Sequence, residues 1–335
     1  MKVAHIREHH APAGTPWRLA AALDADGRRW LDLEEARQGL VLEDPRRAHN
    51  AALFREPITT LDAHLARGLR VEALADVVEG YARASEDDEA HVDASDLAFG
   101  PPILTPPAFR DFYAFERHVG TMWKRRDMEI PEAWYRLPIF YFSNVSEIRG
   151  PGDPVWAPRG SKELDYELEV AALIDTPVRD LAASRAEEAI GGYMILNDWS
   201  ARDLQREETT VRLGPTKGKD FASSIGPWLV TPDEIADARR DTGYDLTMSA
   251  RVNGTELSRG TWASAHFSFG EMIERASADA RLRAGELIGS GTVGTGCLLE
   301  VRDETLGRYL EPGDVVSLAI DRLGELTAPV VARPG

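Results

Sequence analysis

Three acidic residues stand at alternate positions of the segment 165–170: Asp165, Glu167 and Glu169. In a β-strand alternate side chains share one face, so this spacing groups the three carboxylates. Like charges this close repel one another, which either raises a pKa or requires a cation. Hard divalent cations such as Mg²⁺ and Ca²⁺ take carboxylate oxygens as ligands. An isolated motif of this kind is more often the solvated face of an edge strand, so the cation site needs further support.

A further carboxylate follows an apolar strand expected at 193–196. Asp198 ends that strand, and a helix is expected to begin with Ser200 at or near its N-cap. Arg202 and Gln205 are three residues apart and would lie on one face of this helix. Alone, these residues fit a capping aspartate and a solvated arginine. Beside the acidic strand, Asp198 becomes a candidate fourth carboxylate.

Two more polar residues lie seven positions apart, Asp111 and His118. The segment 108–123 is expected to be helical, and seven residues are nearly two turns, so both side chains would lie on the same side of it. An ordinary amphipathic helix with one hydrogen-bonded histidine explains the pair equally well. Lys219, next to Gly218, could bring an ammonium group close to the backbone, or it could belong to a surface loop.

A glycine-rich segment, 289–294, matches the pattern G-x-G-x-x-G. A dinucleotide-binding loop of this type must follow a strand and open a helix. Because the segment 297–302 is expected to be a strand, we reject cofactor binding and expect a tight loop at the active site.

The helices and strands expected from the sequence predict an α+β fold. We expect two domains, a small N-terminal α/β domain at 1–100 and a catalytic domain at 101–335. Prolines and glycines at 100–107 mark the boundary, and the acidic run 86–89 is expected to be a solvated loop. Strands outnumber helices without a regular βαβ alternation. Besides the hairpin at 18–33 and the helices at 61–74 and 183–190, strands are expected at 138–143, 164–174, 192–197, 228–231, 246–252, 255–258, 298–302, 315–321 and 327–332.

Composition narrows the classes of partner. The 335 residues carry a net charge of -17 and are 43% hydrophobic, which is enough for a large core and unfavourable for nucleic acid or anionic membrane. Cys297 is the only cysteine, so no intrachain disulfide can form, as is typical of a reducing cytoplasm. The N-terminus lacks the apolar run of a signal peptide, and no stretch approaches the ~20 apolar residues of a membrane span. A cytoplasmic protein is expected.

Taken in order, these motifs resemble the fumarylacetoacetate hydrolase family. The similarity runs from about Phe109 to Glu300. Its most specific features are the E-L-E strand at 167–169 and, about thirty residues later, the sequence N-D-W-S-A-R-D-L-Q at 197–205. The D-F-Y segment followed by His118 strengthens it. The resemblance implies a mixed β-roll catalytic domain that usually forms a homodimer.

The resemblance also implies a role for each matching position. The divalent cation, Mg²⁺ foremost with Ca²⁺ or Mn²⁺ as alternatives, would be held by Asp111, Glu167, Glu169 and Asp198. The catalytic groups would be the water-activating His118, its partner Glu300, and the oxyanion-stabilising Arg202, Gln205 and Lys219. The substrate would contact Tyr113, Lys124, Tyr141 and Thr292. Fumarylacetoacetase has an arginine where this chain places Lys124, or Arg125 after a one-residue slip, and a tyrosine near Thr209, so the acid-binding end differs.

Three functions remain open at this stage. The first is metal-dependent hydrolysis of a carbon–carbon bond in a small 1,3-diketo acid resembling fumarylacetoacetate or an acylpyruvate. The second is decarboxylation of a β-keto acid such as oxaloacetate, or keto–enol isomerisation, on the same scaffold. The third is a metal-stabilised binding protein without catalysis. The His118–Glu300 pair favours hydrolysis, because only that reaction needs an activated water.

Overall fold

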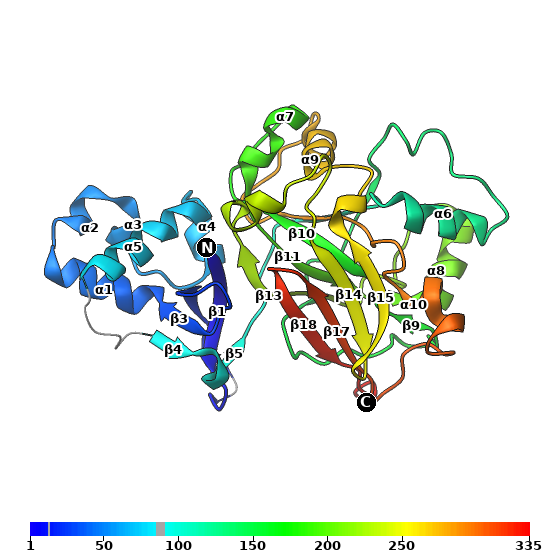
Figure 1. The fold of residues 1–335 in the computed structure, drawn as a ribbon, viewed down its shortest axis with the longest axis horizontal. Coiled ribbons are helices and arrows are strands. Elements are labelled where there is room, and N and C mark those ends of the chain that lie inside the picture. The colour runs from blue at the N-terminus through cyan, green and yellow to red at the C-terminus, as the bar shows by residue number, and fades with distance from the viewer. Residues whose placement is uncertain (13, 85–90) are drawn as a thin grey trace.

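A large mixed β-sheet contains strands from the N-terminal third and from the rest of the chain (Figure 1). Asp111, Glu169 and Asp198 lie on its strands. The computed structural model describes residues 1–12, 14–84 and 91–335. The strand order is β4-β3-β2-β1-β13-β11-β10-β16-β6-β7, with β5 paired to β1 and β8 to β13. These strands are β1 (Lys2–Glu8), β2 (Arg18–Ala22), β3 (Arg29–Asp32), β4 (His91–Asp93), β5 (Leu97–Phe99), β6 (Phe109–Phe112), β7 (Phe140–Phe142), β8 (Ile148–Arg149), β10 (Leu168–Ile174), β11 (Ile190–Asp198), β13 (Ser223–Val230) and β16 (Leu287–Gly289).

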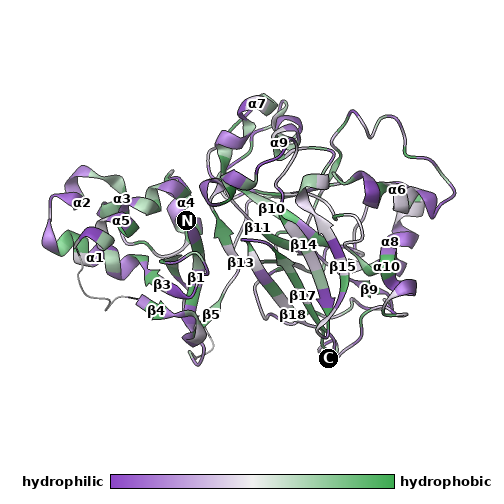
Figure 2. Cartoon of the chain, in the orientation of Figure 1, coloured by the Kyte–Doolittle hydropathy of each residue, from purple (hydrophilic) through white to green (hydrophobic). Residues whose placement is uncertain are grey.

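A second sheet packs against the first and completes the core. Its order is β15-β14-β17-β18, formed by Thr255–Thr261, Thr247–Val252, Val315–Ile320 and Gly324–Pro329. In β17, Val316, Leu318 and Ile320 are buried while the residues between them are more exposed, which is the alternation of a strand with one face on a core. Met248 and Leu318 of this sheet share a buried cluster with Ile195 of the large sheet. Figure 2 shows the apolar residues along these strands.

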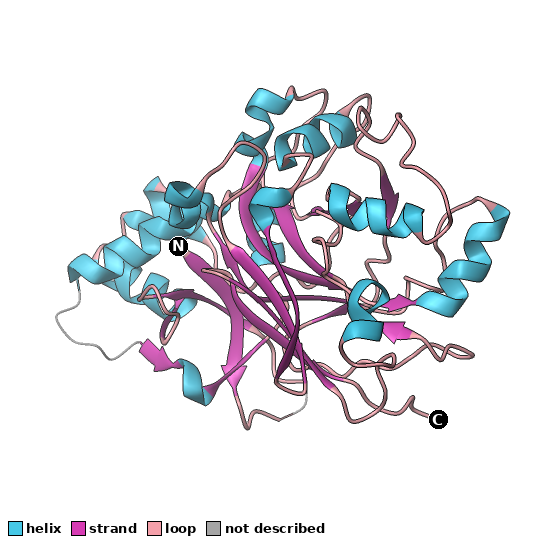
Figure 3. Ribbon diagram, turned by 45° about the vertical axis from the view of Figure 1, so that its right-hand side comes forward, coloured by secondary structure: helices cyan, strands magenta, loops and turns pink. Residues whose placement is uncertain are grey.

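Helices cover the outside of the sheets (Figure 3). The α-helices are α1 (Leu33–Glu43), α2 (Arg47–Asn50), α3 (Ala52–Arg55), α4 (Leu61–Ala66), α5 (Ala75–Ala84), α6 (Glu116–Lys124), α7 (Ala183–Ala186), α8 (Arg202–Glu208), α9 (Phe269–Ser277) and α10 (Leu298–Val301). Short 3₁₀ turns span Val71–Leu74, Ala94–Asp96, Glu187–Ala189, Thr209–Val211, Pro232–Ala238, Trp262–Ser264 and Arg302–Glu304. None of the helices in the described part of the chain is both long and apolar enough to cross a bilayer.

The N-terminal strands belong to the same sheet as the rest of the chain. Strand β1 pairs with β13, with Val3 opposite Leu229. Val3, Leu61, Leu196 and Leu229 share one buried cluster. The sheet and the core both continue across residue 100. They therefore do not mark a domain boundary there, and the expected boundary stays a prediction.

The mixture of helices and sheets is the expected α+β class, but several elements differ from the sequence prediction. The helix expected at 108–123 is wrong: Phe109–Phe112 form strand β6, and helix α6 begins only at Glu116. Strand β6 lies between β16 and β7, and all four of its residues are buried, so it lacks the alternation that identifies a strand. The strand expected at 298–302 is also wrong, because residues Leu298–Val301 form α10. The acidic run 86–89 lies outside the described residues.

The strand expected at 164–174 is interrupted. Residues Leu164–Asp165 form β9, which pairs with β12 (Ser200–Ala201) in a small separate sheet, and β10 begins at Leu168. The three alternating carboxylates therefore stand on two strands and the link between them, and they have different partners.

Candidate active site

Three buried carboxylates from neighbouring strands of the large sheet lie close together. Asp111 comes from β6, Glu169 from β10 and Asp198 from the end of β11, and a ligand oxygen from each lies within 4.8 Å of the others. Among the described residues, Asp111 Oδ1 and Asp198 Oδ1 are buried without a hydrogen-bond partner. Burial raises the pKa of Asp111 and of Glu169 well above the ordinary value, and the neighbouring carboxylates raise both further. Buried oxygens without donors, in a cluster of like charge, fit a hard divalent cation.

The glycine-rich segment wraps the Glu169 carboxylate. The Gly291 amide donates to Glu169 Oε2 at 3.0 Å, and the Thr292 hydroxyl donates to Oε1 at 3.2 Å. A Cβ atom at Gly289 would collide with the Asp111 carboxylate, so this position needs a glycine. The segment is thus a loop of the candidate site, although the reason given for rejecting a cofactor fingerprint was wrong, since a short helix follows it.

Glu167 differs from the other three expected ligands because it pairs with two cationic side chains. Its carboxylate pairs with Lys219 Nζ and, at 2.7 Å, with Arg202 Nη2. Burial alone would raise the pKa of Glu167, but Lys219 and then Arg202 lower it below the ordinary value. Lys219 also pairs with Asp198. Of the four expected ligands, the structure therefore brings Asp111, Glu169 and Asp198 together and places Glu167 beside them in an ion-paired network.

A histidine–carboxylate pair lies next to this cluster. His118 of α6 and Glu300 of α10 are linked by a 2.6 Å hydrogen bond between Nδ1 and Oε1. The Thr295 amide donates to the other oxygen of Glu300 at 3.0 Å. Burial alone would raise the pKa of Glu300, but the bond to His118 lowers it. His118 reaches the site from α6 and Asp111 from strand β6, so the expectation that both stand on one helix is corrected.

Helix α8 supplies the donors expected for an oxyanion. Arg202 Nη1 donates to Gln205 Oε1 at 3.0 Å, which confirms that the two residues share a helix face. Ser200 is not the N-cap; it belongs to β12, and Ala201 occupies the cap position without a side-chain bond.

The loop that carries Lys219 is held by a residue the sequence analysis missed. Glu208, at the end of α8, accepts from the amides of Thr216, Lys217 and Gly218 at 2.9, 2.7 and 3.1 Å. The signal was present, because Glu208 continues the three-residue spacing of Arg202 and Gln205. A Cβ at Gly218 would lie 2.8 Å from the Gln205 backbone nitrogen, so loop and helix are in close contact there.

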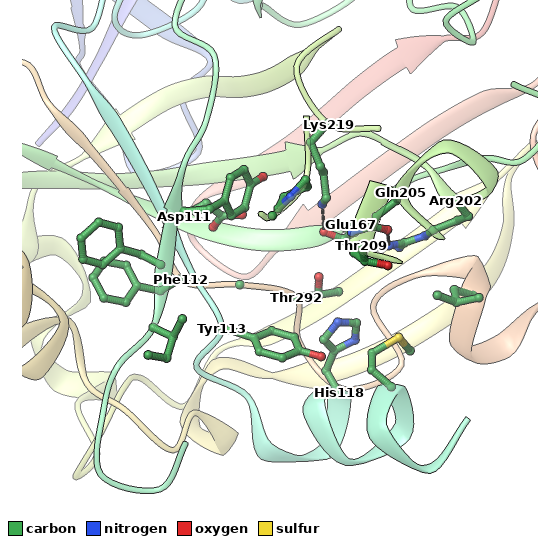
Figure 4. Close-up of a pocket in the computed structure, with 18 of the residues that line it drawn as sticks. Asp111, Phe112, Tyr113, His118, Glu167, Arg202, Gln205, Thr209, Lys219 and Thr292 are labelled. Carbon is green, nitrogen blue, oxygen red and sulfur yellow. Dashed lines mark hydrogen bonds and ion pairs between the residues drawn. The ribbon is translucent and has the colours of Figure 1, made fainter. Parts of the chain in front are cut away.

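Asp111, Glu169 and His118 line a cavity of about 960 Å³, which Figure 4 shows. Tyr113 and Thr292 line it as expected substrate contacts, and Tyr141 lines it while its hydroxyl donates to Asp198 Oδ2 at 2.6 Å. Lys124 does not line this cavity. It faces a second hollow with Glu116 and Met128, whereas the next two residues, Arg125 and Arg126, line the first. Lys124 is the last residue of α6 and Arg125 is its C-cap, so the helix ends between Lys124 and the two arginines that line the cavity.

Comparison with known proteins places this geometry in a family. The profile described as fumarylacetoacetate (FAA) hydrolase, C-terminal, matches residues 108–331. The chain belongs to the fumarylacetoacetate hydrolase family. The resemblance seen in the sequence is confirmed, and the acidic cluster fits the divalent-metal chemistry general to the enzymes of this family.

Relatives within the family carry several activities. A 2,4-didehydro-3-deoxy-L-rhamnonate hydrolase from Sphingomonas sp. (strain SKA58) is 33% identical over 190 residues, covering 56% of this chain and 62% of its own length. The chain spans less than two thirds of the length of this and other curated relatives, among them the fumarylacetoacetases of Arabidopsis thaliana and Oryza sativa.

Solved structures show the fold. Fumarylacetoacetate hydrolase from the psychrophilic Exiguobacterium antarcticum has a TM-score of 0.70 at 24% identity, covering 99% of this chain and 100% of its own. A probable 2-hydroxyhepta-2,4-diene-1,7-dioate isomerase from Mycobacterium abscessus has a TM-score of 0.65 at 24% identity over 100% of both chains. The expected α+β fold of the fumarylacetoacetate hydrolase type is confirmed.

Proposed function

We propose that this family member is a divalent-cation-dependent hydrolase that cleaves a carbon–carbon bond in a small 1,3-diketo acid of the fumarylacetoacetate or acylpyruvate kind. The observation that carries the proposal is that His118, hydrogen-bonded to Glu300, lines the same cavity as Asp111 and Glu169 of the three-carboxylate cluster. A cation site alone would serve several reactions of dicarbonyl acids. A histidine held by a buried carboxylate adds a general base, which hydrolysis requires.

The cation would be held by Asp111, Glu169 and Asp198, with Glu167 next to them. Mg²⁺ is the first candidate, and Mn²⁺ or Ca²⁺ also accept carboxylate oxygens. When bound, it supplies a Lewis acid that polarises a carbonyl and favours the enolate of a dicarbonyl acid.

His118 would take a proton from water, whose oxygen adds to one carbonyl carbon. Glu300 orients the imidazole through Nδ1, as the carboxylate of a catalytic triad does. When the carbon–carbon bond breaks, its electron pair stays on the leaving carbon as an enolate, and His118 returns the proton to that carbon. The products are one new carboxylic acid and one ketone-bearing acid.

The oxyanion formed after attack needs donors. Arg202, Gln205 and Lys219 line the cavity, and both cationic side chains are buried. Donors already oriented in a water-poor site are typically worth ~10²–10³ in rate each. Ion pairs with Glu167 hold Arg202 and Lys219 in place before the substrate arrives.

The substrate's acid end would meet the arginines of the cavity rather than Lys124. Arg125 and Arg126 line the cavity, and the structure gives neither a carboxylate partner among the described residues. Tyr113 and Thr292 would contact the reacting end. A small dicarbonyl acid is the partner proposed; a homodimer and a cytoplasmic location also remain proposals.

The test is an ultraviolet assay that follows the enol absorbance of fumarylacetoacetate, acylpyruvates and oxaloacetate with and without EDTA. Loss of absorbance with release of two acids, abolished by EDTA and by Glu169→Gln, is expected. Glu79→Gln is the matched control, because Glu79 pairs with exposed Arg83 at 2.6 Å and neither residue lines the cavity. Turnover that is indifferent to EDTA would contradict the proposal.

A decarboxylase or isomerase is the second candidate. A structure of the same fold is that of a probable isomerase, and Thr209 lines the cavity near the position where fumarylacetoacetase has a tyrosine. Carbon dioxide released from oxaloacetate without a second acid, in a His118→Ala variant that keeps most activity, would favour this alternative.

A further inference from the structure

One carboxylate of the acidic motif points away from the cation cluster and has no place in the proposed chemistry. Asp165 is fully buried. Its Oδ1 accepts from the Leu298 amide at 2.7 Å, and its Oδ2 accepts from the Leu299 amide at 2.9 Å and from Arg202 Nε at 2.8 Å. A single carboxylate thus joins the start of α10 to the first side chain of α8.

The two elements it joins carry the two halves of the proposed machinery. On α10, Glu300 directly follows Leu299 and accepts the bond from His118. On α8, Arg202 directs its remaining nitrogens to Glu167 and Gln205, at 2.7 and 3.0 Å. Glu300, the partner of the general base His118, and the oxyanion donor Arg202 stand on segments about a hundred residues apart in the chain.

We infer that Asp165 is a positioning residue that fixes Arg202 relative to the His118–Glu300 pair. This inference rests on the proposed function for its catalytic meaning. A buried ion pair is weak evidence of stability, since desolvation of both charges offsets their attraction. Asp165 instead fixes the relative positions of its donors. Two donors are backbone amides of α10, and the third is Arg202, which also contacts Glu167 and Gln205.

Asparagine cannot replace this carboxylate. Its amide nitrogen is a donor and would face an N–H group, so at least one of the three bonds is lost. Displacement of a catalytic group by about 1 Å can cost ~10² in rate. For Asp165→Asn we expect kcat to fall about 100-fold by that reasoning, with little change in KM.

The decisive measurement is a double-mutant cycle of Asp165→Asn with Glu300→Gln. Residues that act as a unit give strongly non-additive losses. If Asp165 acts in part through Glu300, the double variant should lose clearly less activity than the product of the two single losses. Asp203→Asn is the matched control; this carboxylate follows Arg202 but holds Ser161 and the Lys162 amide, at 2.6 and 2.7 Å, and should be additive with near-normal kcat.

Hydrogen–deuterium exchange gives a readout that does not depend on activity. In folded Asp165→Asn, faster exchange is expected in the peptides covering 296–301 and 200–206 and not elsewhere. If wild type hydrolyses a diketo acid but the variant keeps its kcat or the cycle is additive, the inference is overturned and the proposed function stands. If wild type hydrolyses none, the proposed function fails, and exchange alone decides whether Asp165 couples the two segments. Failure of both Asp165→Asn and Asp165→Ser to fold would assign Asp165 to stability and also overturn the inference.

Discussion

At the scale of single residues, the centre is a problem of charge balance. Five carboxylates are buried around it: Asp111, Asp165, Glu167, Glu169 and Asp198. Arg202 and Lys219 are the buried cationic side chains that pair with them. Two positive charges cannot balance five negative ones, so the centre either stays partly protonated or takes a divalent cation. The pKa is raised for Asp111 and Glu169 and lowered for Glu167. The positive charge is therefore lacking at Asp111 and Glu169.

Removing the charge of Glu300 should impair catalysis without disturbing the cation site. In Glu300→Gln the imidazole loses the carboxylate that orients it, and kcat for hydrolysis should fall ~10²-fold or more, in the range of general-base catalysis. The rise in melting temperature on adding Mg²⁺ should remain as in wild type, because Glu300 does not touch the three carboxylates. Glu304→Gln, four residues later and exposed, is the control. An unchanged kcat would remove the general base from the proposal.

Tyr141 can act on the substrate or on the cation site, and the two roles separate in one variant. Its hydroxyl donates to Asp198 Oδ2 at 2.6 Å. Residues that orient a metal ligand typically contribute 10–100-fold to metal affinity. Tyr141→Phe should therefore weaken Mg²⁺ binding, measured by titration calorimetry, while KM at saturating Mg²⁺ stays close to wild type. Tyr135→Phe, whose hydroxyl donates to exposed Glu116, should change neither. A raised KM with unchanged Mg²⁺ affinity would restore the substrate-binding role.

At the scale of elements, the turn before β17 depends on one carboxylate. Asp314 accepts two bonds from Arg308, at 2.7 and 2.8 Å, and others from Asn253 and the Glu311 amide. The bonds from Arg308, opposed by burial, lower the pKa of Asp314 from 3.8 to about 2. Because the folded pKa is the lower one, the stabilisation is complete above pH 3.8 and is lost as pH falls towards 2.

The difference in pKa corresponds to about 2 kcal/mol. Asp314→Asn should lower the free energy of unfolding by about that amount at pH 7, and the gap to wild type should narrow as the pH falls below 4. Urea denaturation from pH 7 to pH 3 measures it. Asp321→Asn, just beyond the other end of β17, is the control, because Asp321 accepts from the Thr247 amide and has no ion pair among the described residues. A constant gap for Asp314→Asn would contradict the linkage.

A helix or strand could be predicted from the sequence where its own residues determine its conformation. The hairpin of β14 and β15 was predictable because Asn253-Gly254 sits between two alternating runs, and the structure has a tight turn there with both residues at positive φ. Strand β6 was not, because it is buried on both faces. Helix α10 was not, because its first turn is held by Asp165, more than a hundred residues earlier in the chain.

The candidate site shows the same division. Asp111, Glu169, Asp198, His118 and Glu300 were named from motif and resemblance. In the structure Asp111, Glu169 and His118 line one cavity, Asp198 lies beside the first two, and Glu300 is hydrogen-bonded to His118. The roles that depend on a single side-chain direction were not accessible. Asp165 and Glu167 have the same spacing as Glu169, yet one holds two helices and the other pairs with two cations. Arg125 lines the cavity in place of Lys124, and the two residues are adjacent at the end of α6.

At the scale of the whole molecule, the shared sheet ties the N-terminal third to the site. Strand β13 pairs with β1 on one side and with β11, which ends in Asp198, on the other. Trp228 of β13 packs against Trp30 and Phe99, with ring centroids 5.6 and 5.9 Å apart. Lys2 also lies over the Trp228 ring, 5.4 Å from its centroid. Loss of order in the N-terminal strands would therefore expose an edge and a face of the strand next to β11.

This arrangement predicts a single cooperative unfolding transition. Far-UV circular dichroism, tryptophan fluorescence and calorimetry should give coincident midpoints, as for a protein with one core. Trp228→Ala should lower the stability by about 3 kcal/mol, since it removes a large aromatic contact, and should lower all three midpoints together. Trp156→Ala is the control, because this ring stacks on Arg149 away from the N-terminal strands. An early transition confined to residues 1–100 in Trp228→Ala would show instead that the N-terminal region folds as a separate unit, and the boundary expected from the sequence would then hold in energetic terms although the sheet crosses it.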